Sequence, residues 1–223
     1  SNAFNPFGED TTFRHRLIEV GPRLFDIEND VFRLVSGVKF DIGDSWQGEA
    51  AFLYNKSETI SFVQNAVSAD AFKEALASSD PATAYNIFGA GLGINSPSVL
   101  DALRVNTLRR AESELRMFDV KAAGDLYELP GGTLALAVGA ETAQTESSDI
   151  ADSLSMSNKI VGSGGTSNSG SRSRDAAYGE FMIPVIGAAN RISGIHSFGL
   201  QAAWRVAQYS DFCSADKPPF GVK

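Results

Sequence analysis

The side chains that could do chemistry are charged residues set opposite apolar ones in segments of alternating sequence. Residues two apart lie on the same face of a β-strand, so each segment would carry one apolar and one charged face. A charged face of this kind could line a channel or meet a polar partner, and no two members form an acid–base pair that spacing alone would assign. The candidates are Arg33, Lys39, Asp41, Glu49, Asp119, Lys121, Asp125, Glu141, Glu180 and Arg205.

Motifs for catalysis and cofactor binding are sparse. The sequence has two histidines, His15 and His196, and one cysteine, Cys213, too few for a multi-cysteine metal site. It has no Gly-x-Ser-x-Gly nucleophile elbow. The glycines of 89–93 lack the Gly-Lys-Ser/Thr ending of a phosphate-binding loop and predict an ordinary loop. We therefore expect a protein that is not an enzyme and that uses no cofactor and no metal.

Composition narrows the class further. The 223 residues are 43% hydrophobic, with 19 basic and 27 acidic side chains and a net charge of −8. The chain is too apolar to be disordered, and its acidic balance argues against nucleic acid as a partner. No run of about 18 apolar residues would make a transmembrane helix, but the strands of a membrane barrel alternate instead of running apolar.

Alternation predicts three antiparallel hairpins with strands of roughly 9–12 residues, the bilayer-crossing length. Short turns are expected at Gly43-Asp44-Ser45 and Pro130-Gly131-Gly132, and a longer connection at 187–197. A weaker strand pattern covers 14–24. The paired segments are 31–42 with 46–55, 118–126 with 133–141, and 177–185 with 198–206.

Two long connections separate these hairpins. Residues 57–112 contain two helix signals: Ser68 before an amphipathic stretch to Leu76, and Ser96-Pro97 before a helical pattern over 99–110. Residues 145–174 are rich in Ser, Gly, Thr and Asn and predict a flexible surface loop. The fold class expected is therefore all-β and antiparallel, with short helices in long loops.

Short and long connections alternate along the chain, which is typical of an outer-membrane barrel. A soluble antiparallel sandwich or meander would show the same alternation within its strands. In the first case the charged faces would line a lumen, and in the second they would be ordinary solvated faces.

Several stretches, in order along nearly the whole chain, resemble the barrel domain of TonB-dependent outer-membrane receptors. The longest runs from Val99 through Arg116 and continues from Phe118 to Glu141. Shorter stretches are Asn5-Pro6-Phe7-Gly8, Val20-Gly21-Pro22-Arg23, Phe32-Arg33-Leu34-Val35-Ser36-Gly37, Tyr209-Ser210-Asp211-Phe212 and Lys217-Pro218.

The resemblance implies part of a 22-stranded, plugged barrel in the bacterial outer membrane. Such receptors import siderophores, cobalamin, haem or carbohydrates, with energy passed on by the TonB complex through a plug that this chain lacks. The partners expected are this complex, a small-molecule solute and membrane lipid. The turns at 43–45 and 130–132 would be periplasmic, and residues 57–112 and 145–174 extracellular. The ten charged residues above would face the lumen.

The ends of the chain also suggest a piece of a longer protein. Residues 1–3, Ser-Asn-Ala, resemble the remnant of an expression vector, which leaves 4–223 as the barrel segment of about six strands. Two other functions remain open. A soluble β-sheet module could bind a ligand such as a carbohydrate, stacking it on Trp46, Tyr54 or Trp204. A hydrolase would need two carboxylates at catalytic separation in a cleft.

Overall fold

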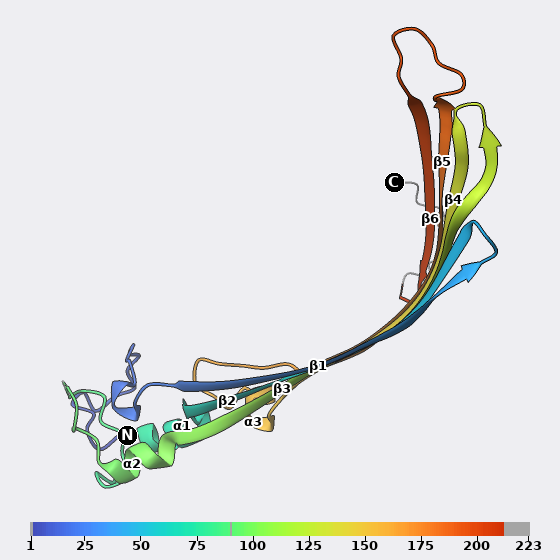
Figure 1. The fold of residues 1–223 in the computed structure, drawn as a ribbon. Helices are drawn as coiled ribbons and strands as arrows, with labels where there is room; N and C mark the ends of the chain where they lie inside the picture. Colours follow the sequence, from blue (N-terminus) through green and yellow to red (C-terminus); the bar gives the residue numbers. More distant parts are fainter. Residues whose placement is uncertain (1, 90, 212–223) are drawn as a thin grey trace. The chain divides into compact units, whose positions relative to one another are not determined.

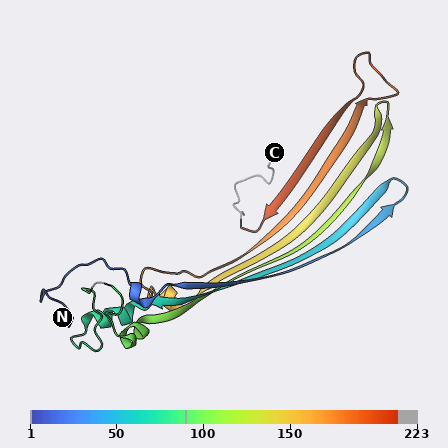
Figure 2. The same cartoon turned by 60° about the vertical axis from the view of Figure 1, so that its left-hand side comes forward.

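Six long strands form one open antiparallel sheet in a computed structural model that describes residues 2–89 and 91–211 (Figure 1). The strands lie side by side in chain order, as Figure 2 shows from a second direction. This confirms the predicted fold class, all-β and antiparallel with short helices between strands. The strands are β1 (Leu24–Ile42), β2 (Trp46–Val67), β3 (Arg104–Leu129), β4 (Gly132–Ala151), β5 (Asn168–Ile186) and β6 (Phe198–Tyr209).

The expected turns are in place. Residues 43–45 join β1 to β2, residues 130–131 join β3 to β4, and residues 187–197 join β5 to β6. Gly43 has a φ of +65°, a left-handed conformation that suits glycine. In the last hairpin Tyr178 pairs with Arg205, and the register shifts once, between Pro184 and Ile186.

The predicted strand lengths were wrong for every strand except β6. The other five have 19 to 26 residues instead of roughly 9–12. The apolar alternation that predicts each of these five strands covers only part of its length. The backbone ladder continues past the end of this alternation, because hydrogen bonding between strands does not require an apolar face.

Two compact units divide the residues of the chain. Unit 1 comprises residues 1–30, 58–112 and 148–169, and unit 2 comprises residues 31–57, 113–147 and 170–223. β1 to β5 each contribute residues to both units, and the described part of β6 belongs to unit 2.

The helices of the described residues lie in unit 1: η1 (Ile18–Val20), α1 (Ala69–Ala77), α2 (Pro97–Leu103) and α3 (Ser153–Met156). Both predicted N-caps are confirmed, because the hydroxyl of Ser68 accepts from the Ala71 N–H and that of Ser96 from the Val99 N–H. The helix predicted over 99–110 was wrong beyond Leu103. Arg104 begins β3 and donates from Nε to the carbonyl of Val20 at 2.8 Å, so a distant contact overrides local helix propensity.

The long connections are more ordered than predicted. Residues 58–67 and 104–112 are strand instead of loop, as are 145–151 and 168–174. The segment 14–24 was expected to be strand-like and instead forms η1, with β1 starting at Leu24. The Ser- and Gly-rich segment is tied to α1, because Ala69 N–H donates to the carbonyl of Lys159 at 2.8 Å and Val161 N–H to that of Val67 at 2.9 Å. Ile160 is accordingly buried.

The hydrophobic core of unit 1 lies between the helices and the adjoining strand ends. Its buried members are Val20, Val67, Ala75, Tyr85, Val99 and Leu103. Tyr85 is fully buried, its ring meets that of Phe72 edge-on at 5.5 Å, and its hydroxyl lies 3.3 Å from Nε2 of His15. Asn2 donates to the carbonyls of Ala75 and Tyr85.

No helix among residues 2–89 and 91–211 has the length and apolarity needed to cross a membrane. Residues 212–223, which include Cys213 and the Lys217-Pro218 stretch, lie outside the described part of the chain.

Candidate functional site

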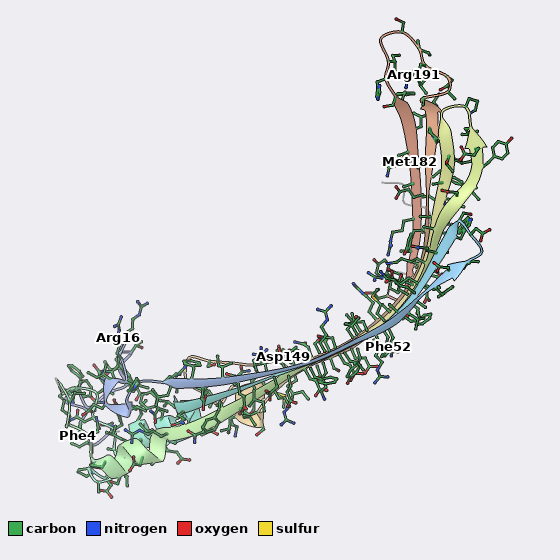
Figure 3. All side chains as sticks on the ribbon, in the orientation of Figure 1. Phe4, Arg16, Phe52, Asp149, Met182 and Arg191 are labelled. Carbon is green, nitrogen blue, oxygen red and sulfur yellow. The ribbon has the colours of Figure 1, made fainter. Side chains whose placement is uncertain are left out.

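One face of the unit 2 strands carries a band of exposed apolar side chains, which we call the apolar band. Its large members are between 37% and 62% exposed, far more than a hydrophobic core allows. Phe52, labelled in Figure 3, belongs to it. The exposed members are Phe32, Leu34, Val38, Phe40, Ile42, Phe52, Phe118, Val120, Leu126, Val138, Val185, Phe198, Leu200 and Trp204. Leu134, Leu136 and Phe181 on the same face are half-buried.

Aromatic rings join neighbouring strands across the apolar band by lying over glycines. A Cβ added to Gly48 would sit 2.4 Å from the ring of Phe40, and one added to Gly124 would sit 2.4 Å from the ring of Trp46. On the last hairpin a Cβ at Gly179 would be 2.7 Å from Nε1 of Trp204. These contacts place the alternating residues of β1, β2 and β3 on one face, and those of β5 and β6 likewise.

The apolar band has a polar border along each strand. On the same alternating positions, the sequence turns from apolar to charged or amide side chains. Tyr54 marks this border on β2, with its ring 6.0 Å from that of Phe32 and its hydroxyl donating to Glu114 at 3.2 Å. The border residues are Asp30, Lys56, Glu58, Glu114, Arg116, Gln144, Glu146, Asp175 and Gln208.

The apolar band is narrow compared with the strands. Each strand contributes nine to eleven residues to the band, from its polar border to its turn-side end. These are Phe32 to Ile42 on β1 and Trp46 to Tyr54 on β2. The corresponding ranges on the other strands are 118–126, 134–142, 177–185 and 198–206.

The opposite face, which we call the polar face, brings together many of the residues predicted as lumen-facing. Glu49 of β2 lies between two lysines on neighbouring strands: its Oε2 is 3.7 Å from Nζ of Lys39 and 3.4 Å from Nζ of Lys121. All three side chains are partly solvated, so these pairs are weak individually.

A second cluster on the polar face joins β3 to β6. Glu141 is only 10% exposed and pairs with Arg205 and with Arg174, the latter at 2.8 Å. Tyr178 donates to Asp119 at 3.4 Å, and the guanidinium of Arg205 lies 5.6 Å from its ring centre.

Tyr178 reaches Asp119 by crossing β4 at a glycine. A Cβ added to Gly139 would lie 2.3 Å from the Tyr178 ring, so a larger residue would displace the ring. The sequence offered only the alternation of Gly139 with its neighbours, and Arg174 and Tyr178 were not among the predicted residues. Neither could be placed in this cluster without knowing that β5 lies beside β4.

The remaining predicted residues take part in fewer hydrogen bonds and ion pairs. Glu180 accepts a hydrogen bond from Gln201. Asp41, Asp125 and Glu180 line an open hollow of about 840 Å³ beside the 43–45 turn. The polar face also forms a smaller hollow of about 360 Å³ around Lys39, Glu49 and Lys121. Arg33 forms no side-chain hydrogen bond or ion pair with residues 2–89 and 91–211, and whether this face lines a lumen stays a prediction.

Unit 1 contains a buried polar cluster that the sequence did not indicate. Asn95 is 6% exposed; its Nδ2 donates to Glu19 and to the carbonyl of Asn86, and its Oδ1 accepts from the Asn86 N–H at 2.6 Å. Burial alone would raise the pKa of Glu19, but the Asn95 side chain and the N–H groups of Ile94 and Asn95 lower it. This cluster holds Asn86, Ile94 and Asn95 against Glu19 of η1.

No group of three metal-ligating side chains occurs within residues 2–89 and 91–211. The described residues of unit 2 form two opposed faces of a sheet, one mostly apolar and one carrying most of the charged side chains. No protein-family model, curated protein or solved structure matches this chain.

Proposed function

We propose that this chain is a six-stranded part of an outer-membrane β-barrel of the TonB-dependent receptor type. In this proposal the apolar band faces lipid and the polar face lines the lumen. The two short turns and the 187–197 connection are periplasmic, and the unit 1 connections between strands are extracellular. The role is import of a scarce solute, without enzymatic chemistry.

The observation that carries the proposal is the apolar band with its polar border. A membrane-crossing strand needs about 9–11 residues, alternating apolar and polar side chains. Each strand contributes nine to eleven such residues, and the same face then turns polar although the strand continues. A soluble sheet would pack a second layer on this face, but the described residues of unit 2 bury nothing larger than alanine among their hydrophobic side chains.

The connections support the same arrangement. Two turns have three and two residues, whereas the connections at the other strand ends contain α1, α2 and α3. Short turns on one side and long connections on the other are typical of outer-membrane barrels. β1 and β6 each have one unpaired edge in this sheet, and the missing barrel strands of a parent receptor would pair with these edges.

Ligand capture would belong to unit 1. Phe7 and Phe88 are both exposed and meet edge-on at 5.9 Å. Each is held two residues after an asparagine, since the Phe7 N–H donates to Asn5 and the Phe88 N–H to Asn86, both at 3.0 Å. A fixed backbone beneath exposed rings suits contact with a solute such as a siderophore, cobalamin, haem or carbohydrate. Passage past the polar face would then need the plug and the TonB complex of the parent receptor.

A cysteine scan across one strand tests the proposal. In a Cys213→Ser background, single cysteines replace Phe118, Asp119, Val120 and Lys121, and the chain is reconstituted in lipid vesicles. We expect a water-soluble maleimide to label positions 119 and 121 and to spare 118 and 120.

Glu112→Cys is the matched control, because it lies on the same alternating face of β3 beyond the apolar band. It should react rapidly. Labelling of 118 and 120 as fast as 112 would contradict a lipid-facing band. So would a compact monomer in plain buffer that detergent leaves unchanged, which would favour the soluble ligand-binding module.

A further inference from the structure

The connection between β5 and β6 is much longer than the other two turns at the same strand ends. It has eleven residues, 187–197, against three at 43–45 and two at 130–131. Its base is built into the sheet: Asn190 accepts from the Gly187 N–H and donates to the Val185 carbonyl, both at 2.7 Å. Gly187 also lies against Gly131, whose carbonyl oxygen would be 2.0 Å from a Cβ at Gly187. The base of the loop is therefore held in place by specific contacts with the sheet.

The tip of this loop is a tight turn that displays two isoleucines. Ile195 N–H donates to the Ile192 carbonyl at 3.0 Å, and Gly194 between them has a φ of +89°. The Ile192 and Ile195 side chains are 53% and 44% exposed. Turn positions in water usually hold Gly, Pro, Asn, Asp or Ser, so two exposed β-branched apolar residues need an apolar environment to cover them.

The charge around the tip favours a phosphate-bearing partner. Residues 187–197 contain Arg191 and His196 and no acidic residue, in a chain whose net charge is −8. Figure 3 labels Arg191 in this loop. The loop leaves and rejoins the sheet beside Val185 and Phe198, two exposed members of the apolar band. Apolar residues beside a cationic one, next to a lipid-facing surface, are the composition of an interfacial anchor.

We infer that the 187–197 loop is a membrane anchor: Ile192 and Ile195 enter the head-group region of the periplasmic leaflet, and Arg191 pairs with phospholipid phosphates there. The inference rests on the proposed function, because it needs the apolar band in lipid. It would fix the depth of the β5–β6 hairpin in the bilayer, which the two short turns cannot do.

Spin-label depth measurements test the anchor. In the Cys213→Ser background, a nitroxide is placed at Ile192→Cys, at Val120→Cys in the apolar band, and at Ser45→Cys in a short turn at the same strand ends. The chain is reconstituted in vesicles of phosphatidylcholine with phosphatidylglycerol. The ratio of each label's accessibility to oxygen and to a water-soluble nickel complex then gives its depth in the bilayer.

We expect the label at 120 deep in the acyl chains, that at 192 in the head-group region, and that at 45 in water. A label at 192 as water-exposed as that at 45, with 120 in lipid, overturns the anchor and leaves the proposed function standing. A label at 120 in water overturns both.

The pairing of Arg191 with lipid phosphate is tested by a separate measurement. Omitting phosphatidylglycerol should make the label at 192 shallower, and Arg191→Gln should remove this dependence on lipid charge. Dependence that survives Arg191→Gln overturns the assigned role of Arg191. The substitution lies outside the Asn190 contacts that hold the loop base.

Discussion

Unit 1 and unit 2 use their hydrophobic residues in opposite ways. In the described residues of unit 1, Val20, Tyr85 and Leu103 are almost completely buried. In the described part of unit 2, the buried hydrophobic residues are Ala143 and Ala176, while phenylalanines and a tryptophan are exposed. The first pattern is that of a protein folded in water. Under the proposed function lipid covers the exposed residues of unit 2, so the two units should respond differently to the same kind of change.

The largest effect should come from the core of unit 1. Leu103→Ala removes a fully buried side chain from the cluster around Tyr85, at an expected cost of about 2–5 kcal/mol in unfolding free energy. Hydrogen exchange followed by mass spectrometry should show lost protection in peptides covering 69–77 and 97–103. Peptides of unit 2 should keep theirs in detergent.

Ala102→Ser is the matched control, because Ala102 lies next to Leu103 on α2 and is exposed. Equal loss of protection in both units would show that they unfold together, and the comparison between them would fail.

The next effect should appear only in lipid. Val138→Arg puts a charge in the middle of the apolar band on β4, which costs about 2–4 kcal/mol near the bilayer midplane. The control is Ala137→Arg, one residue earlier on the polar face and beside the hollow at Asp41. Urea or guanidinium unfolding in vesicles should separate the two variants, with Val138→Arg less stable. Similar stability of the two would mean that both faces meet the same solvent.

The sequence predicted the faces of the sheet well and the extent of its elements poorly. Alternation from Phe32 to Ile42 is a local pattern, so it survives in the structure. The end of α2 at Leu103 depends on Arg104 reaching the Val20 carbonyl, 84 positions away. The continuation of β3 through Ser113 likewise depends on pairing with neighbouring strands, because the residues of this part of β3 suit a helix equally well.

The candidate site shows the same division. The polarity of Glu49 and Glu141 was readable, because each sits opposite an apolar neighbour. Lys39 and Lys121 were predicted on the same face, but the contacts of Glu49 with Lys121 and of Glu141 with Arg174 were not, because they join strands of different predicted hairpins. The buried Asn95 cluster had no sequence signal, because an asparagine in a glycine-rich loop is ordinary until the fold places Glu19 beside it.

A smaller effect is expected where the polar face is tightly packed. Gly139→Ala should displace the Tyr178 ring from Asp119 and cost about 1–3 kcal/mol, the usual cost of overpacking. Unfolding in detergent would measure this, with Tyr178→Ala as the second arm of a double-mutant cycle. In the Tyr178→Ala background the glycine substitution should cost much less. An unchanged cost would show that Gly139 matters for the backbone and not for the ring.

The smallest effect concerns pH and unit 1. Because the folded state lowers the pKa of Glu19 below its usual 4.5, the ionised carboxylate stabilises the fold above that pH. This stabilisation is lost as the pH falls through the lower, folded value, when the Asn95 side chain and the Ile94 N–H lose a charged acceptor. Peptides covering 86–95 should therefore lose hydrogen-exchange protection in that acidic range, after correction for the slower intrinsic exchange of amides at low pH. Glu19→Gln should flatten the response, whereas Glu74→Gln, an exposed carboxylate on α1, should leave it in place. A response unchanged by Glu19→Gln would place the acid sensitivity of unit 1 outside the Asn95 cluster.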